Sequence, residues 1–171
     1  MNAAMFAVGE TVLYNRTGVC RVEGIGTPPF QKNDGLNYYT LRSVFSTSGE
    51  QIYVPVEAMV SMRPLVDSKA VSSYLEMIPQ LTPEIFHSKR PADLAMHYQE
   101  LLTSCDLKDT LLLMKEIYLK QATSKKLGQV DTRYLKIAER MVCEEFAFIL
   151  GTSPDLIHKR LYAVMRQAVS G

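Results

Sequence analysis

The chain has 171 residues, and with 47% hydrophobic residues it is long enough to bury one ordinary core or two small ones. Its formal net charge is +1: residues 1–66 carry five basic and five acidic side chains, which leaves fourteen basic and thirteen acidic ones in the remainder. Because both halves are close to neutral, the composition argues against a protein that binds nucleic acid on its own, for which a strongly basic face is typical.

The first 66 residues show the two-residue period of β-strands, divided by turns rich in Gly, Pro and Asn. Five short antiparallel strands in about 60 residues predict a small SH3-like or Tudor-like β-barrel. We expect this domain to span residues 1–66. Its strands are expected near Phe6–Tyr14, Gly18–Ile25, Leu36–Ser43, Gln51–Val56 and Val60–Arg63.

The fourth predicted strand alternates, with Ile52, Val54 and Val56 on one face and Tyr53 and Pro55 on the other. Because proline cannot donate a hydrogen bond to a sheet ladder, Pro55 indicates an edge strand or a bulge. Such an edge is either protected against aggregation or leaves its backbone groups available to a partner strand.

From Asp67 onward the apolar residues follow the period of α-helices, which predicts a second domain over residues 67–171. Ser68 can cap the first helix, which stops before Pro79, and residues 79–91 form a connector. The chain as a whole is therefore expected to be α+β, with the β-barrel followed by a bundle of about five α-helices. The later helices are expected from Pro91 to about Thr103, from Asp106 past Tyr118, over Asp131–Leu150 and from Ser153 onward.

The longest of these helices has an apolar stripe that consists of Leu135, Ala138, Val142, Phe146 and Ile149. Phe148 lies off this stripe, so it faces either the β domain or solvent. Packing between the domains at this point would fix the angle between them.

The sequence contains no pattern typical of a membrane protein, a metal centre or a catalytic site. No apolar run approaches the roughly 20 residues of a membrane span, and Met1–Met5 lacks the basic head of a signal peptide, so we expect a cytoplasmic protein. The cysteines and histidines have no metal-ligand spacing, and a phosphate-binding glycine loop, GxSxG and HExxH are absent. We therefore expect no metal, no cofactor, no small-molecule substrate and no enzymatic activity. The residues concerned are Cys20, Cys105, Cys143, His87, His97 and His158.

Several separated segments together resemble the CarD family of bacterial transcription regulators, including its member CdnL. The N-terminal part of this pattern also resembles the RNA-polymerase-interacting module of the transcription-repair coupling factor, which is Tudor-like. Nearly the whole chain is covered, and the N-terminal segments are the more specific ones because they match in register. The segments are Phe6–Tyr14, Gly18–Val22, Tyr38–Arg42, Ile52–Val56, Glu100–Asp106, and Lys126-Leu127 followed by Asp131 and the helix over Ala138–Leu150.

This resemblance implies a regulator whose barrel docks on a lobe of the RNA polymerase β subunit by pairing strands. It also implies that the helical domain reaches promoter DNA at the upstream edge of the melting bubble and stabilises the open promoter complex. On this basis we expect the polymerase-binding surface at Thr27, Gln51, Tyr53 and Pro55.

The helical half departs from the family in one feature, because many members carry a tryptophan that wedges into the minor groove and this chain has no tryptophan. The corresponding neighbourhood is Lys89-Arg90-Pro91, which offers no side chain with the stacking area of an indole. Scattered cations remain as candidate phosphate contacts, and three of them share one helix face by their spacing. Contact with free DNA would be weak and sequence-independent, roughly 10⁻⁴ to 10⁻⁶ M at physiological salt. The candidate DNA-binding residues are Lys89, Arg90, Lys125, Lys126, Arg133, Lys136 and Arg140.

Three alternatives stay open at the level of sequence. The cations can belong to a solvated helix face and an exposed hinge, in which case the protein is an interaction adaptor that does not bind DNA. A DNA-binding protein that acts without polymerase is disfavoured by the charge balance, and an enzyme by the missing motifs.

Overall fold

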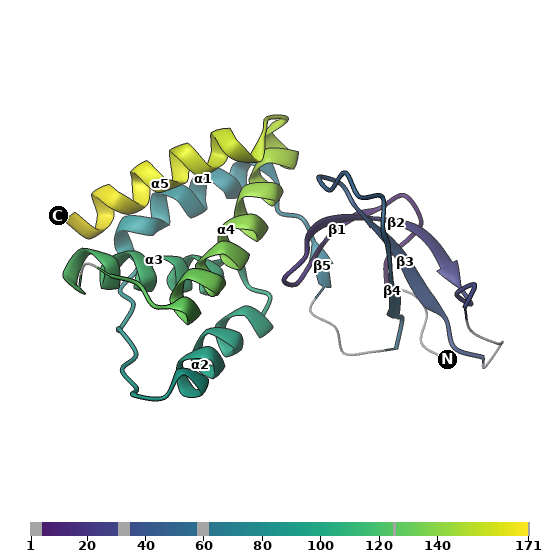
Figure 1. The fold of residues 1–171 in the computed structure, drawn as a ribbon. Helices are drawn as coiled ribbons and strands as arrows, with labels where there is room; N and C mark the ends of the chain where they lie inside the picture. The colour runs from purple at the N-terminus through teal and green to yellow at the C-terminus, as the bar shows by residue number, and fades with distance from the viewer. Residues whose placement is uncertain (1–4, 31–34, 58–61, 125, 171) are drawn as a thin grey trace.

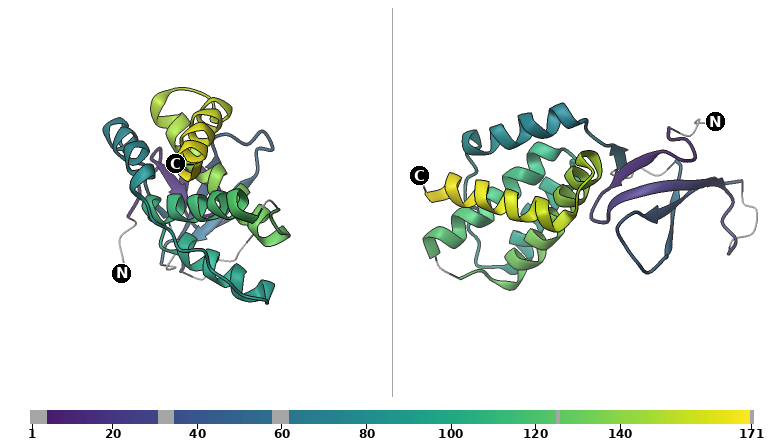
Figure 2. Two further views of the ribbon diagram at one scale, coloured as in Figure 1. Left: turned by 90° about the vertical axis from the view of Figure 1, so that its left-hand side faces the viewer. Right: turned by 90° about the horizontal axis from the view of Figure 1, so that it is seen from above.

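The computed structural model describes residues 5–30, 35–57, 62–124 and 126–170 of the chain. An antiparallel β-sheet forms one lobe and five α-helices form the other, which confirms the predicted α+β class (Figure 1). The C-terminus lies at the end of the helical lobe that points away from the sheet (Figure 2). The elements are β1 (Thr11–Tyr14), β2 (Gly18–Gly26), β3 (Tyr38–Ser43), β4 (Gln51–Pro55), β5 (Met62–Pro64), α1 (Ser68–Met77), the 3-10 turn η1 (Ile78–Gln80), α2 (Pro91–Thr103), α3 (Leu107–Ser124), α4 (Gln129–Leu150) and α5 (Pro154–Ser170).

The five strands pair in the order β4-β3-β2-β1-β5, so β4 and β5 are the two outer strands. The predicted closure into a barrel is not confirmed, because no pairing joins β4 to β5 among the described residues. The first strand is shorter than predicted, since Gly9 has a φ of 92° and the Glu10 N–H donates to the Ala7 carbonyl in a turn. Residues Val60 and Ser61 of the fifth predicted strand lie outside the described residues.

One face of the sheet carries a small apolar core built by the alternating residues of its strands. The predicted inner face of β4 packs on this core, because Val54 is buried and Ile52 and Val56 are partly buried against the same cluster. Phe6 precedes β1 and still joins this core, with its ring centroid 5.9 Å from that of Tyr39 in an edge-on arrangement. The buried residues of the cluster are Phe6, Val12, Cys20, Val22, Tyr39, Leu41 and Val54.

The helices begin and end close to the predicted residues, with one different cap. Asp67, and not Ser68, caps α1: its Oδ1 accepts a hydrogen bond of 2.7 Å from the Ala70 N–H. Pro91 occupies the first position of α2 as expected, and α4 ends at Gly151, which has a φ of 68°. No helix in the described ranges is long and apolar enough to cross a membrane.

The connector between α1 and α2 is held by a lysine in the middle of α3. Lys115 is 6% exposed, and its Nζ donates to the carbonyls of Ile78 and Leu81 at 2.8 and 2.7 Å. The Ile78 carbonyl also accepts a hydrogen bond of 3.2 Å from the Leu81 N–H, so the ammonium group adds a second donor at the C-terminal end of α1 and η1.

The core of the helical lobe extends into the sheet. Leu13 of β1 and Val19 of β2 belong to the same buried cluster as the side chains of α2 to α5. Phe148, predicted to lie off the main stripe, is half-buried against this cluster. The two lobes are therefore joined by apolar packing as well as by the connecting chain.

Candidate functional site

The outer strand β4 presents three of the four residues predicted to bind a partner. Gln51, Tyr53 and Pro55 alternate with the core residues and therefore share the outer face of the sheet. β4 pairs with β3 on one side, and no strand pairs with its other side among the described residues. The strand thus offers a row of backbone groups together with three side chains on one face.

Thr27, the fourth predicted residue, lies at the same end of the sheet as Pro55. It follows Gly26, whose cross-strand partner Tyr38 is also the partner of Pro55. Thr27 is exposed, so the structure brings all four predicted residues to one region of the β lobe.

Hydrogen bonds orient the polar side chains of this surface before any partner arrives. The Tyr53 hydroxyl donates to Gln51 Oε1 at 3.0 Å, and Gln51 Nε2 donates to Glu23 Oε2 at 3.1 Å. Arg42 of β3 forms an ion pair with the same Glu23 carboxylate. The Arg42 guanidinium and then the Gln51 amide lower the pKa of Glu23, so this carboxylate stays ionised at neutral pH.

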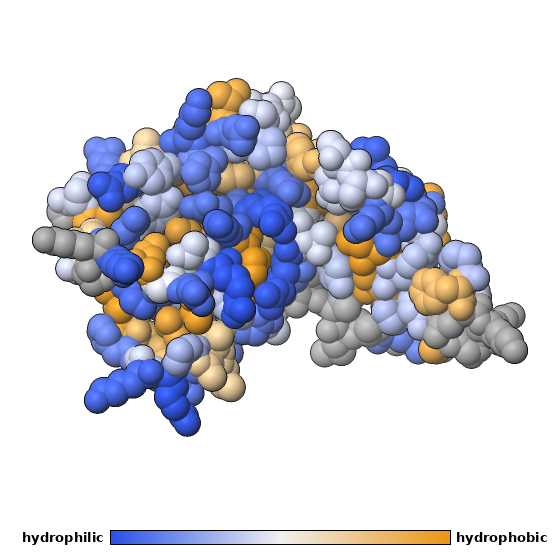
Figure 3. Space-filling view, viewed as in Figure 1, coloured by the Kyte–Doolittle hydropathy of each residue, from blue (hydrophilic) through white to orange (hydrophobic). Residues whose placement is uncertain are grey.

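An aromatic residue that the sequence analysis missed completes the surface. Phe30 is 67% exposed, and its ring stands edge-on to that of Tyr53 with 5.0 Å between the centroids. Figure 3 shows a hydrophobic patch on the β lobe toward the end at which β2 finishes. A pair of aromatic rings at the surface, one of them exposed, is typical of an interface anchor. The sequence does contain one signal for this residue: Phe30 follows Pro28-Pro29 directly and lies outside any alternating apolar run, where a buried position is not expected.

Four of the seven predicted DNA-binding residues gather around the N-terminal end of α4. Lys89 and Lys126 line a pocket of about 450 Å³, and Arg133 and Lys136 line a neighbouring one of about 380 Å³. Both pockets include Gly128, at which α4 begins. The positive end of the helix dipole adds to these side-chain charges, so this region is suited to a phosphate backbone. We call these four residues the basic face.

Of the other three predicted cations, the structure describes Arg90 and Arg140, and each has a further neighbour or pocket of its own. Arg90 forms an ion pair of 3.1 Å with Asp93, which neutralises part of its charge. Arg140 lies further along α4 in a pocket between the lobes, and Lys125 lies outside the described residues. Arg140 also lines a pocket of about 300 Å³ together with Lys136, so these two residues of the predicted helix face lie close to each other.

A buried carboxylate supports the start of α4 beneath the basic face. Asp131 is 2% exposed and accepts a hydrogen bond of 2.7 Å from the Tyr98 hydroxyl, with Lys120 Nζ 3.0 Å from its other oxygen. Burial, and then the contact with Asp131, raises the pKa of Tyr98. Asp131 therefore ties α2, α3 and α4 together where the cations converge.

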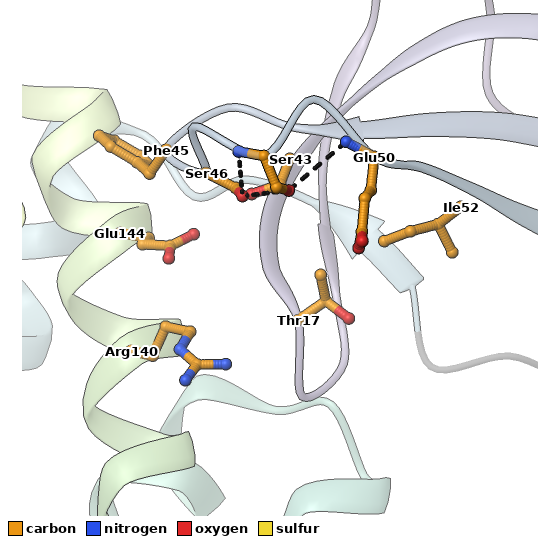
Figure 4. A pocket seen from close by; sticks show the side chains of 9 residues that line it. Thr17, Ser43, Phe45, Ser46, Glu50, Ile52, Arg140 and Glu144 are labelled. Carbon is orange, nitrogen blue, oxygen red and sulfur yellow. Dashed lines mark hydrogen bonds between the residues drawn. The ribbon is translucent and has the colours of Figure 1, made fainter.

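A polar pocket of about 340 Å³ lies between the β domain and α4 (Figure 4). Glu144 and Arg140 reach into it from α4, opposite Ser46 and Glu50 of the chain between β3 and β4. Burial raises the pKa of Glu144, an effect that the hydrogen bond from the Val19 N–H partly offsets. No group of three or more His, Cys, Asp or Glu side chains suited to a metal occurs in the described part of the chain.

Comparison with known families identifies the β part of the molecule. Residues 6–66 match the model of the CarD-like/TRCF RID domain. The matched range covers all five strands and ends one residue before the cap of α1. A search of curated proteins finds no match to the chain.

Proposed function

Because residues 6–66 form a CarD-like/TRCF RID domain, an RNA-polymerase-interacting module, we propose that this protein is a CarD-like transcription regulator that docks on the polymerase β subunit. The observation that carries the proposal is this family match, which coincides with an outer strand unpaired on one side among the described residues. The proposal involves no catalytic step by the protein itself.

Docking by strand addition fits the surface of β4. An incoming strand takes its affinity from main-chain hydrogen bonds and its specificity from alternate side chains. Here the alternate side chains are Gln51, Tyr53 and Pro55, with Phe30 extending the apolar part beside Tyr53. Such a contact is small and transient, below about 1,200 Å² of total buried surface.

The test is binding of the purified chain to an isolated lobe of the β subunit. The double variant Tyr53→Asp, Pro55→Asp should raise the Kd at least about tenfold, or ~1.4 kcal/mol, since two charges would have to be desolvated in the contact. Phe30→Ser should weaken binding by removing the ring that packs on Tyr53. Isothermal titration calorimetry measures each change.

The matched control is Ser72→Asp with Gln80→Asp, which adds the same two charges at exposed positions on the helical lobe. This control should bind as the wild type does. Equal affinity of the Tyr53→Asp, Pro55→Asp variant and the wild type would remove β4 as the docking surface.

We further propose that the helical domain contacts promoter DNA weakly and without sequence preference, and thereby prolongs the life of the open complex. The convergence of Lys89, Lys126, Arg133 and Lys136 at the start of α4 supports this role. A near-neutral domain gains little from free DNA, but a domain tethered to polymerase meets DNA at a high effective concentration.

The second prediction concerns the lifetime of the open complex in the presence of the protein. Arg133→Glu with Lys136→Glu should shorten this lifetime and reduce its dependence on salt, because each lost phosphate contact removes about one released counterion. A competitor-challenge assay at several salt concentrations measures both quantities. The control is Lys159→Glu with Arg160→Glu, the same change of charge at exposed positions of α5 outside the basic face.

A protein-interaction adaptor without DNA contact is the second candidate. The absence of tryptophan and the ion pair between Arg90 and Asp93 favour it. Under this alternative, both charge-reversal variants would leave the open-complex lifetime unchanged while polymerase binding persists.

A further inference from the structure

Two adjacent glutamates of α4 are buried where that helix meets the β domain. Glu144 is 9% exposed and Glu145 is fully buried, although both belong to the longest helix of the chain. A buried carboxylate is costly unless it is paired and hydrogen-bonded. Because consecutive residues point about 100° apart on a helix, the two side chains reach different parts of the β domain.

Glu145 binds the last strand of the β domain. Its two oxygens accept two parallel hydrogen bonds of 2.7 Å from the guanidinium of Arg63 in β5, and Oε2 also accepts one of 3.0 Å from the Val66 N–H. Arg63 Nε donates in addition to the Cys105 carbonyl between α2 and α3. A bidentate pair of this kind restricts direction as well as distance.

Glu144 binds the second strand. Its Oε1 accepts a hydrogen bond of 3.1 Å from the Val19 N–H, next to Gly18, where a Cβ would lie 2.3 Å from the same oxygen. The carboxylate therefore occupies the space that a side chain at residue 18 would need.

The hairpin that joins β1 to β2 makes a third contact with the helical lobe, next to α4 (Figure 1). The Arg16 N–H donates to the sulfur of Met141 at 3.4 Å, and its guanidinium donates to Gln99 of α2 at 2.6 Å. The β domain is thus held at β5, at β2 and at a hairpin tip. A single contact leaves rotation free, whereas three separated contacts define one orientation.

We propose that Glu144, Glu145 and Arg63 are positioning residues that fix the orientation of the β domain relative to the helical domain. The functional part of this inference rests on the proposed function: with β4 docked on polymerase, the fixed orientation directs the basic face toward the DNA. None of the three residues lies on the docking strand or in the basic face. Their loss should therefore spare polymerase binding and impair the effect on the open complex.

The orientation is measured first in the free protein, by pulsed electron paramagnetic resonance between spin labels at Arg21→Cys on β2 and Lys159→Cys on α5. Both positions are exposed, and the three native cysteines are buried, so the labels attach to the introduced thiols. We call the contacts of Glu144, Glu145 and Arg63 the clamp. With the clamp unaltered, the two labels should give one narrow distance distribution. Glu145→Gln should broaden it, because the amide keeps the shape but loses the charge that pairs with Arg63.

Two further variants separate positioning from folding. Arg63→Lys keeps the charge and loses the planar fork, so it should give an intermediate width and keep the protein folded. Glu139→Gln removes a carboxylate from the same helix whose partners are Tyr118 and His158, both in the helical lobe, and should leave the distribution narrow.

The second readout compares polymerase binding with the open-complex lifetime for the same variants. Glu145→Gln should bind the β-subunit lobe as the wild type does and shorten the lifetime several-fold. A distribution that stays narrow in both Glu145→Gln and Arg63→Lys would overturn the clamp, and a broadened one with an unchanged lifetime would overturn its functional part. If the wild type itself fails to bind polymerase, the proposed function fails, while the distance measurement still decides whether the clamp exists.

Discussion

At position 18 the backbone conformation and the neighbouring side chain both require glycine. Its φ is 113°, in the region that L side chains rarely adopt, and Glu144 fills the volume next to its Cα. Gly9 has a similar φ of 92°, but no atom lies within 4 Å of the position of an added Cβ. A side chain at position 9 would therefore cause backbone strain alone, whereas one at position 18 would cause both strain and a steric clash with Glu144.

Gly18→Ala should destabilise the protein by roughly 2–4 kcal/mol, the sum of backbone strain and overpacking against Glu144. Gly9→Ala, with the strain alone, should cost about 1–2 kcal/mol. Urea unfolding monitored by circular dichroism gives both values. Equal losses for the two variants would show that Glu144 moves aside without cost and does not define the position of β2.

At the scale of elements, residues at the helix ends largely set where each helix begins and ends. Pro91 opens α2 and Gly151 closes α4 because each fits the backbone required at its position. The first helix differs from expectation by one residue, since both Asp67 and Ser68 are good caps and only the backbone angles decide between them. Asp67 has a ψ of 171°, whereas Ser68 is already helical.

Asp67→Ala should lower the stability by about 1 kcal/mol and the Tm by a few degrees, because the Ala70 N–H loses its acceptor. Ser68→Ala is the matched control and should change the Tm little, since it removes a side chain from the first helical position, where alanine is tolerated. Differential scanning calorimetry compares the two. A larger loss for Ser68→Ala would reassign the cap.

At the scale of the whole molecule, the two lobes are not independent units joined by a linker. The apolar cluster of the helices includes Leu13 and Val19 from the sheet, and polar contacts of α4 bracket this shared core. The β4 edge and the basic face are left exposed in the same arrangement. The proposed bridge between polymerase and promoter would need this combination of a fixed interior and two exposed surfaces.

The sequence by itself determined the α+β order, most helix and strand limits to within a few residues, and the outer position of β4, because periodicity, proline and caps act over short distances. The start of β1 is the exception, since it lies five residues later than predicted. Only the tertiary structure decided that β4 and β5 are the two outer strands of the described sheet, that Lys89 and Lys126 share a pocket, and that Phe30 meets Tyr53. Glu145 and Arg63 are 82 residues apart, and no local pattern relates them. Two acids at the edge of an apolar stripe signal an unusual environment, but their partners depend on which surfaces fold together.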